Sequence, residues 1–245
     1  KLKSAGIIFS DIPIASSSDH HSRTEIMKIS KEKSNDETGI PCTYFGNAPW
    51  DKIACEKLVV TVNMSDLAAV GASPSGILIS EIIPKLFSEE KIEELQRGIS
   101  DACSTYNTFL LGGDTNEGEN LVLTGTAIGI IQNKKPISRL GCNPGEILFS
   151  SGKLGNGNAY AISKLISQTN SFSKYKPLAR IKESSMLSTY ASCCMDTSDC
   201  LISTLDQLMR LNNAGFELNE NWQNVIEDDA LEYSKNSNLP PWLLL

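Results

Sequence analysis

Residues 110–115 read Leu-Leu-Gly-Gly-Asp-Thr, and we expect the fold to be organised around them. Two apolar residues followed by two glycines indicate the end of a buried strand that runs into a loose turn. Such a turn would present the carboxylate of Asp114. Residues 63–66 and 195–199 combine aspartate with small residues in a similar way. We therefore hypothesise that the acids of these three stretches converge on a metal-bound phosphate.

The candidate ligands for that metal are four aspartates at small-residue junctions: Asp66, Asp114, Asp196 and Asp199. Mg²⁺ takes hard oxygen ligands and commonly bridges a few carboxylates to nucleotide phosphates. Asp196 and Asp199 are three residues apart, so a turn at a helix start could aim both to one side. Equally well, Asp196 or Ser198 could cap the helix while Asp199 interacts favourably with its dipole, and Gly-Gly-Asp after a strand is often only a turn. Both interpretations stay open on these residues alone.

Length, composition and charge argue against a nucleic-acid-binding protein and a membrane protein. The 245 residues give room for one large domain or two small ones, and a net charge of -7 argues against a broad nucleic-acid-binding surface. The sequence contains no run of 18 or more apolar residues, so it predicts no transmembrane helix. No convincing signal-peptide core follows the amino terminus. We expect a cytoplasmic protein with neither membrane nor nucleic acid as a partner. Residues 240–245 form an apolar end, so we expect further residues beyond them.

Cysteine and histidine offer little catalytic chemistry. The seven cysteines are scattered without a C-x-x-C pair, which favours reduced thiols over a disulfide framework or zinc site. His20 and His21 are adjacent, so they predict no Ser-His-Asp or Cys-His arrangement; they are either ligands or an exposed loop pair. Residues 152–157 are glycine-rich but lack the spacing of a P-loop or a dinucleotide fingerprint, which favours a packing turn.

Periodicity predicts alternating strands and helices up to residue 131. Strands are expected over residues 76–83, 108–111 and 121–131. A helix capped by Ser88 should separate the first two, with an apolar face of Ile92, Leu95, Ile99, Ala102 and Tyr106. Residues 53–58 have helical spacing, but the β-branched residues 59–62 leave their own assignment ambiguous.

The polar, proline-closed residues 132–136 predict a boundary between two domains, 1–135 and 136–245. In the second domain, strands are expected at 147–150 and 216–218. Helices are expected after residue 157, over 181–191 and after 195–199. The last of these should bury Leu201, Ile202, Leu205, Leu208 and Met209.

Four motifs occur in a fixed order along the chain. Residues 63–74 read Asn-Met-Ser-Asp-Leu-Ala-Ala-Val-Gly-Ala-Ser-Pro, and residues 111–115 read Leu-Gly-Gly-Asp-Thr. Residues 139–146 read Arg-Leu-Gly-Cys-Asn-Pro-Gly-Glu, and residues 195–201 read Met-Asp-Thr-Ser-Asp-Cys-Leu. Together they resemble the ATP-dependent superfamily of aminoimidazole ribonucleotide synthetase, selenophosphate synthetase, the hydrogenase maturation dehydratase and thiamine-monophosphate kinase. The last family is the best match, roughly over residues 49–245.

The resemblance implies an α/β (α+β) fold of two domains, with mixed sheets packed by helices and amino-terminal domains that pair into a homodimer. It implies phosphoryl transfer from ATP to thiamine monophosphate, giving thiamine diphosphate. The metal ligands would be Asp66, Asp114, Asp196 and Asp199, and the catalytic pair Asp114 and Asp199. The ATP contacts would be Tyr106, Gly113, Asp114, Arg139 and Ser198. Such chemistry needs positioning and charge neutralisation more than a nucleophilic side chain.

Two departures motivate alternatives. The family's early Gly-Asp-Asp-Ala motif is not recognisable, and Cys200 stands where the family has glycine. One alternative is a paralogue that binds ATP but is inactive or acts on another acceptor. Another is a related synthetase that acts through an acyl-phosphate.

Overall fold

The computed structural model describes residues 52–131, 135–166, 172, 175–198, 200–218 and 221–245. All of them belong to one unit of the chain, Asp51–Leu245. His20 and His21, for which the sequence leaves two roles open, lie outside the described residues.

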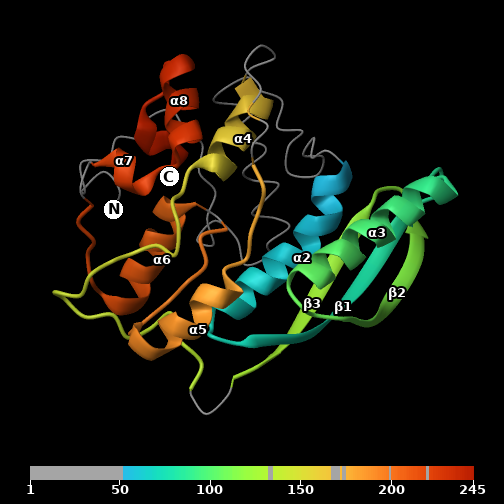
Figure 1. The fold of residues 1–245 in the computed structure, drawn as a ribbon, viewed down its shortest axis with the longest axis horizontal. Coiled ribbons are helices and arrows are strands. Elements are labelled where there is room, and N and C mark those ends of the chain that lie inside the picture. Colours follow the sequence, from blue (N-terminus) through green and yellow to red (C-terminus); the bar gives the residue numbers. More distant parts are fainter. Residues whose placement is uncertain (1–51, 132–134, 167–171, 173–174, 199, 219–220) are drawn as a thin grey trace. The chain divides into compact units, whose positions relative to one another are not determined.

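One mixed sheet dominates the first part of the described chain (Figure 1). Its strands are β1 (Ser73–Pro84), β2 (Leu110–Gly118) and β3 (Val122–Ile130), in the order β2-β1-β3. β1 pairs in parallel with β2 and antiparallel with β3. Parallel neighbours need a crossover connection, and helix α3 (Glu89–Thr105) provides it between β1 and β2. The strands predicted over residues 76–83 and 121–131 are confirmed, as is the mixed α/β class.

Helix α2 (Lys52–Ala69) resolves the ambiguous stretch at residues 59–62. These β-branched residues are helical because the helix buries part of them: Val59 and Val60 lie in the core beside Met64. Tertiary packing therefore overrides a local preference that amounts to a few tenths of a kcal/mol per residue, roughly. Asp66 consequently lies inside a helix and is exposed, and the strand-end junction predicted for it is wrong.

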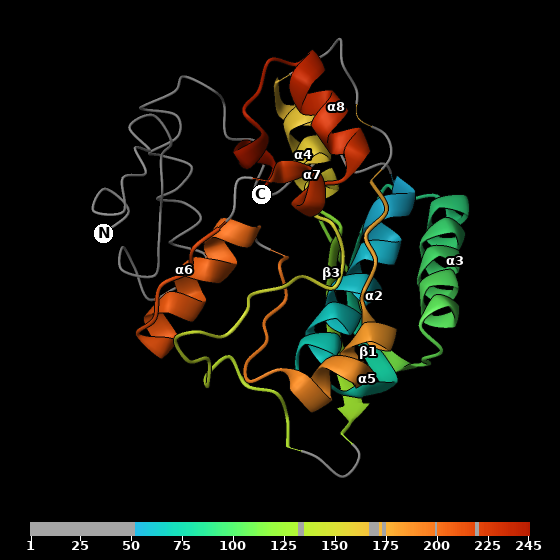
Figure 2. The same cartoon turned by 60° about the vertical axis from the view of Figure 1, so that its left-hand side comes forward.

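Helices α2 and α3 together cover one face of the sheet (Figures 1 and 2). The core between them contains side chains from both helices and from β1: Val60, Met64, Ile77, Ile79, Leu95 and Ile99. Ser88 caps α3 as predicted, with its hydroxyl accepting from the Lys91 amide at 3.4 Å. The predicted apolar face of α3 is confirmed at Leu95, Ile99 and Ala102, which are buried.

The turn predicted at residues 112–115 is wrong. β2 begins at Leu110 and continues to Gly118, paired with β1 along its length. The two glycines are explained by close approach to that strand, because a Cβ at Gly113 would collide with the Ile79 carbonyl oxygen. Residues 110–117 are exposed, so the strand is not the buried one that the sequence predicts.

The second part of the described chain is mainly helical. Its elements are α4 (Asn156–Ile166), α5 (Ile181–Tyr190), α6 (Leu201–Asn212), α7 (Trp222–Val225), α8 (Asp228–Asn236) and the 3₁₀ helix η3 (Pro241–Leu244). The helices predicted after residue 157, over 181–191 and after 195–199 are confirmed. The strands predicted at 147–150 and 216–218 are wrong, because these described residues are irregular. Ile147, for example, is 88% exposed.

Helices α4, α7, α8 and η3 pack together around buried Ala159, Ile226, Ala230 and Leu244 (Figure 1). A parallel bridge between Leu154 and Ile226 holds the approach to α4. None of the helices in the described part of the chain has the length and apolar character needed to cross a membrane.

Candidate functional site

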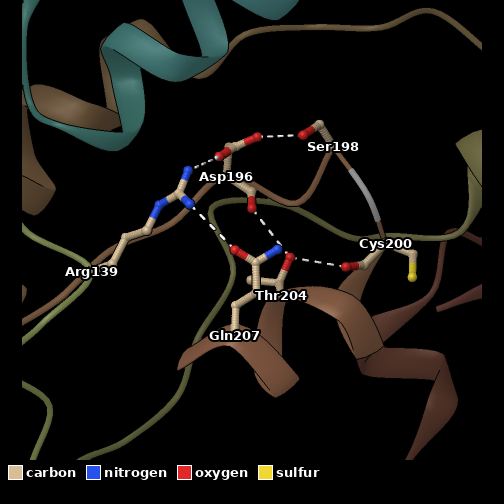
Figure 3. A network of polar contacts seen from close by, with 6 residues as sticks. All are labelled: Arg139, Asp196, Ser198, Cys200, Thr204 and Gln207. Carbon is tan, nitrogen blue, oxygen red and sulfur yellow. Dashed lines mark hydrogen bonds and ion pairs between the residues drawn. The ribbon is translucent and has the colours of Figure 1, made fainter. Parts of the chain in front are cut away.

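One group of predicted site residues surrounds Asp196 (Figure 3). Its carboxylate lies 3.7 Å from the Arg139 guanidinium and accepts a hydrogen bond from the Ser198 hydroxyl at 2.5 Å. The Asp196 side chain is only 7% exposed, whereas that of Arg139 is half exposed. The structure thus brings Arg139 together with two residues of one loop, Asp196 and Ser198, that lie at least 57 positions further along the chain.

Helix α6 holds both loops of this group. Gln207 accepts from the Arg139 guanidinium at 3.3 Å, and the Thr204 hydroxyl donates to the Asp196 carbonyl at 3.2 Å (Figure 3). At the end of the helix, the Asn212 amide donates to the Arg139 carbonyl at 2.9 Å and accepts from the Gly141 amide at 2.7 Å. Three polar side chains of one helix therefore set the distance between the guanidinium and the carboxylate.

The start of α6 has an unusual backbone. The residue at the N-cap is Cys200, with φ 73° and ψ 162°, and it makes no side-chain capping hydrogen bond. This combination is almost confined to glycine. Cys200 therefore occupies a conformation that suits the glycine of the resembling family, and the simple capping role considered for Asp196 and Ser198 is not what the structure contains.

Asp114 lies on β2 in a more open setting. Its carboxylate is exposed and accepts from the Asn116 side-chain amide at 2.8 Å. Asp114 pairs with Ser80 of β1, and partners in adjacent strands share a face of the sheet. Ser80 is exposed, so both residues lie on the face opposite α2 and α3. Asp114 is thus available to a ligand without any loss of packing.

The neighbouring residue of β2, Thr115, belongs to the other face. Its hydroxyl donates to Glu81 at 3.4 Å, and the Gln96 amide of α3 donates to both oxygens of that carboxylate at 3.0 Å. Glu81 is 5% exposed. A buried carboxylate needs such partners, because leaving it unpaired costs several kcal/mol, roughly. These bonds fix β2, and hence Asp114, against α3.

Tyr106 makes two hydrogen bonds that the sequence did not predict. Its hydroxyl donates to Thr61 of α2 at 3.2 Å and accepts from the Ala179 amide at 3.0 Å. It therefore joins α2 to the chain before α5, and its predicted contact with ATP stays a prediction. Gly113 is explained by the close approach of β2 to Ile79 of β1, and its predicted contact with the nucleotide also stays a prediction.

Among the residues that the structure describes, no three carboxylate, thiol or imidazole side chains lie close enough to hold one metal ion. Asp66, Asp114 and Asp196 are therefore not gathered into a cluster. Asp199 lies outside the described residues, so its metal and catalytic roles stay predictions. Of the residues predicted to bind metal and ATP, the described part of the structure therefore brings together Arg139, Asp196 and Ser198.

A second polar contact joins the same two loops. Glu146 accepts from the Asn143 amide at 2.7 Å and from the Ser192 hydroxyl at 2.7 Å. The Asn143 backbone bond first, and then the Ser192 hydroxyl, lower the pKa of the Glu146 carboxyl. The negative charge therefore stabilises the contact between residues 139–146 and residue 192.

Sequence reasoning missed the residues that position the group: Gln207, Thr204, Asn212, Glu146 and Ser192. Each acts through a long-range contact or a backbone carbonyl, and no local pattern marks such a role. Polar residues between the apolar positions of α6 were the available signal, but a solvated helix face has the same pattern.

The chain is similar in sequence and in fold to proteins of one family. Residues 35–131 match the family model described as AIR synthase related protein, N-terminal domain. The thiamine-monophosphate kinase of Methanocaldococcus jannaschii is 32% identical over 75% of this chain and 61% of its own length. That of Pyrococcus abyssi is 29% identical over 72% of this chain and 55% of its own length. The chain therefore spans little more than half of these curated relatives.

A similar solved structure is thiamine monophosphate kinase from Aquifex aeolicus, with a TM-score of 0.70 and 23% identity. The match covers 79% of this chain and 68% of that one. It extends the likeness from sequence to fold, beyond the residues of the family model. Residues 35–131 therefore match the AIR synthase related N-terminal domain, and the chain is similar in sequence and fold to the thiamine-monophosphate kinases.

Proposed function

We propose that this chain is an ATP- and Mg²⁺-dependent phosphotransferase that converts thiamine monophosphate to thiamine diphosphate. The observation that carries the proposal is the Arg139–Asp196–Ser198 group, in which a guanidinium, a carboxylate and a hydroxyl of the predicted site are in contact. The names of the similar proteins support the reaction, and one similar structure, AaThiL, is a complex with AMPPCP and TMP.

The chain's own residues would act by positioning. Arg139 offers a fixed positive charge to a nucleotide phosphate, since Gln207 and Asp196 already orient its guanidinium. Ser198 is a hydroxyl donor to the other oxygen of the Asp196 carboxylate, as Figure 3 shows. Phosphoryl transfer asks a protein mainly for alignment and charge compensation, and these groups supply both.

The donor set fits Mg²⁺. This ion is usually held by one or two carboxylates together with substrate phosphates, so a protein cage of three acids is not required. Asp66, Asp114, Asp196 and Asp199 are its proposed ligands, and Asp114 and Asp199 are the proposed catalytic pair. When bound, the ion would neutralise charge on the phosphate oxygens.

The test is the formation of thiamine diphosphate by purified protein supplied with thiamine monophosphate, ATP and MgCl₂, followed by chromatography. The proposal expects product that disappears with EDTA and returns with excess Mg²⁺. ATP binding without product would support the paralogue that is inactive or uses another acceptor. Product from a different phosphate acceptor alone would replace the substrate and keep the reaction class.

We also propose that the chain forms a homodimer through the part of the open sheet face that β1 and β3 make. That face carries exposed apolar side chains from β1 and β3: Leu78, Ile82, Val122, Ile128 and Ile130. An apolar sheet face of this kind gains stability when it is covered, and a second copy offers the same surface. Light scattering of the wild type and an Ile128→Lys variant tests this, with a dimer and a monomer expected; two monomers would refute it.

A domain boundary near residue 135 is part of the same proposal. It is supported by the change from a mixed sheet to a mainly helical chain at that point. Limited proteolysis should then cut first near residues 132–136, and a first cut inside β1 or α3 would argue against the boundary.

A further inference from the structure

Three cysteines lie beside the Asp196 group and take no part in it. Cys142 belongs to the loop that carries Arg139, and Cys193 and Cys194 belong to the loop that carries Asp196. All three are partly buried free thiols. Arg139 lies three residues before Cys142, and Asp196 lies three residues after Cys193.

Backbone contacts hold these two loops together. The Cys194 amide donates to the Ser138 carbonyl at 3.0 Å. At Gly141, a Cβ would lie 2.8 Å from the Ser192 carbonyl oxygen, so only glycine allows this approach. The Ser192 hydroxyl donates to Glu146 at 2.7 Å. The loops are therefore apposed on both sides of the cysteines.

Cys142 follows Gly141 and Cys193 follows Ser192, so this backbone approach brings the two cysteines to adjoining positions of the two loops. Burial first, and then the Cys142 thiol, raise the pKa of the Cys193 thiol to about 11. Cys193 therefore keeps its proton near neutral pH.

Cys194 is a poorer partner for either thiol. Adjacent residues have Cα atoms about 3.8 Å apart, whereas a disulfide normally spans roughly 4.4–6.8 Å, so Cys193 and Cys194 cannot pair without distortion. Burial raises the pKa of the Cys194 thiol, and the Met195 backbone amide lowers it by less. Cys142 contributes to the raised pKa of Cys193 but is not among the groups that shift the pKa of Cys194, so we take Cys142 and Cys193 as the pair.

We propose that Cys142 and Cys193 form a reversible disulfide, an oxidation site that clips the Arg139 loop to the Asp196 loop. The oxidant is a small-molecule disulfide such as glutathione disulfide. One protein thiolate attacks it, forms a mixed disulfide and releases one glutathione. The second protein thiol loses its proton and attacks the protein sulfur of that mixed disulfide, which releases the second glutathione. The two cysteines lose two electrons and two protons, and the glutathione disulfide gains both.

The clip would close a chain segment of about 50 residues, from one loop to the other. Such a crosslink restricts the unfolded chain, so the oxidised protein should unfold at a higher temperature than the reduced one. We expect a rise in Tm of roughly 5–10 °C for a protein of this size.

The test is oxidation of the whole 245-residue chain with glutathione disulfide, quenching with N-ethylmaleimide and peptide mapping by mass spectrometry without reductant. The expected result is a Cys142–Cys193 linkage that dithiothreitol removes. Cys142→Ser and Cys193→Ser should each abolish both the linkage and the rise in Tm, whereas Cys194→Ser and Cys200→Ser should keep both.

Other outcomes would overturn the proposal. These are a linkage of Cys142 or Cys193 mainly to another cysteine, only mixed disulfides with glutathione after prolonged oxidation, or loss of the linkage in Cys194→Ser. A Cys142→Ser variant that unfolds is replaced by Cys142→Ala, and failure of the wild type alone to form the linkage is decisive in either case. The test needs no nucleotide, so its failure leaves the proposed kinase function untouched.

Discussion

Asp114 and Asp196 carry the same carboxylate in opposite settings. Asp196 is nearly buried, and Arg139 and Ser198 hold it in place from two sides. Asp114 lies on an exposed strand, with the amide of Asn116 as a near neighbour. Asp196 is therefore tied to the stability of its loops, whereas Asp114 can be changed with little cost to the fold. The contrast predicts that activity and stability separate at these two positions.

The largest effect is expected at Asp114. Asp114→Asn keeps the shape and the contact with Asn116 but removes the charge, so activity should fall by roughly a hundredfold or more. Tm should stay within about 1 °C of the wild type, because the side chain is exposed. Steady-state kinetics and thermal unfolding measure the two effects, with Glu117→Gln on the same strand as the control. A variant with unchanged kcat would remove Asp114 from the proposed site.

Asp196→Ala should instead reduce stability. It leaves the Arg139 guanidinium and the Ser198 hydroxyl without this partner, at a cost of about 1–3 kcal/mol in the free energy of unfolding. Asp206→Ala is the matched control, since Asp206 pairs with Arg210 one turn away at 2.8 Å on α6 and should cost about 0.3–0.5 kcal/mol. Equal losses in urea unfolding would contradict the special position of Asp196.

Cys200→Gly tests the backbone that follows Asp196. Holding Cys200 at φ 73° and ψ 162° costs about 1–3 kcal/mol of conformational strain, which glycine avoids. Glycine also raises the conformational entropy of the unfolded chain, which offsets part of this gain. We expect a net gain of about 1 kcal/mol. Asn213→Gly, at φ 51° and ψ 39° on the other end of α6, is the control and should change little, because asparagine tolerates that region. A loss of stability at Cys200 would argue against the strain.

The smallest effect is a pH dependence at Glu146. Its pKa is lower in the folded protein, so the contact contributes stability above the ordinary pKa of a glutamate and loses it as the pH falls through the lowered value. Glu146→Gln should therefore flatten the fall in Tm between about pH 5 and pH 3. Parallel curves for the two proteins would show that the loop contact does not depend on this charge.

The same comparison explains how far the sequence could predict the structure. Helices were found because α3 and α6 bury residues at spacings of three and four, a pattern that is local. Strand predictions were wrong where strand formation depends on pairing with another strand. Residues 112–118 pair with β1 and form a strand, although a turn was predicted there. Residues 147–150 are irregular, although their apolar run predicted a strand. Pairing depends on a distant partner that no single stretch reveals.

The candidate site shows the same limit. Ordered motifs indicated Asp114, Arg139, Asp196 and Ser198, but the residues that orient them, such as Gln207 and Asn212, act across about 70 positions of sequence. Their roles follow from the three-dimensional contacts alone. The resemblance did anticipate one backbone feature, since a glycine position of the family corresponds to the positive φ of Cys200.

We propose that this chain binds a nucleotide through Mg²⁺ at Asp114 and the Asp196 group. Calorimetric titration with the non-hydrolysable analogue AMPPCP, with MgCl₂ or with EDTA, tests it most directly. We predict saturable binding with Mg²⁺ that is at least tenfold weaker in EDTA, and tenfold weaker again in Asp114→Asn, as expected for loss of one ligand charge. Binding of equal strength with and without Mg²⁺, or no binding by the folded wild type, would contradict the claim.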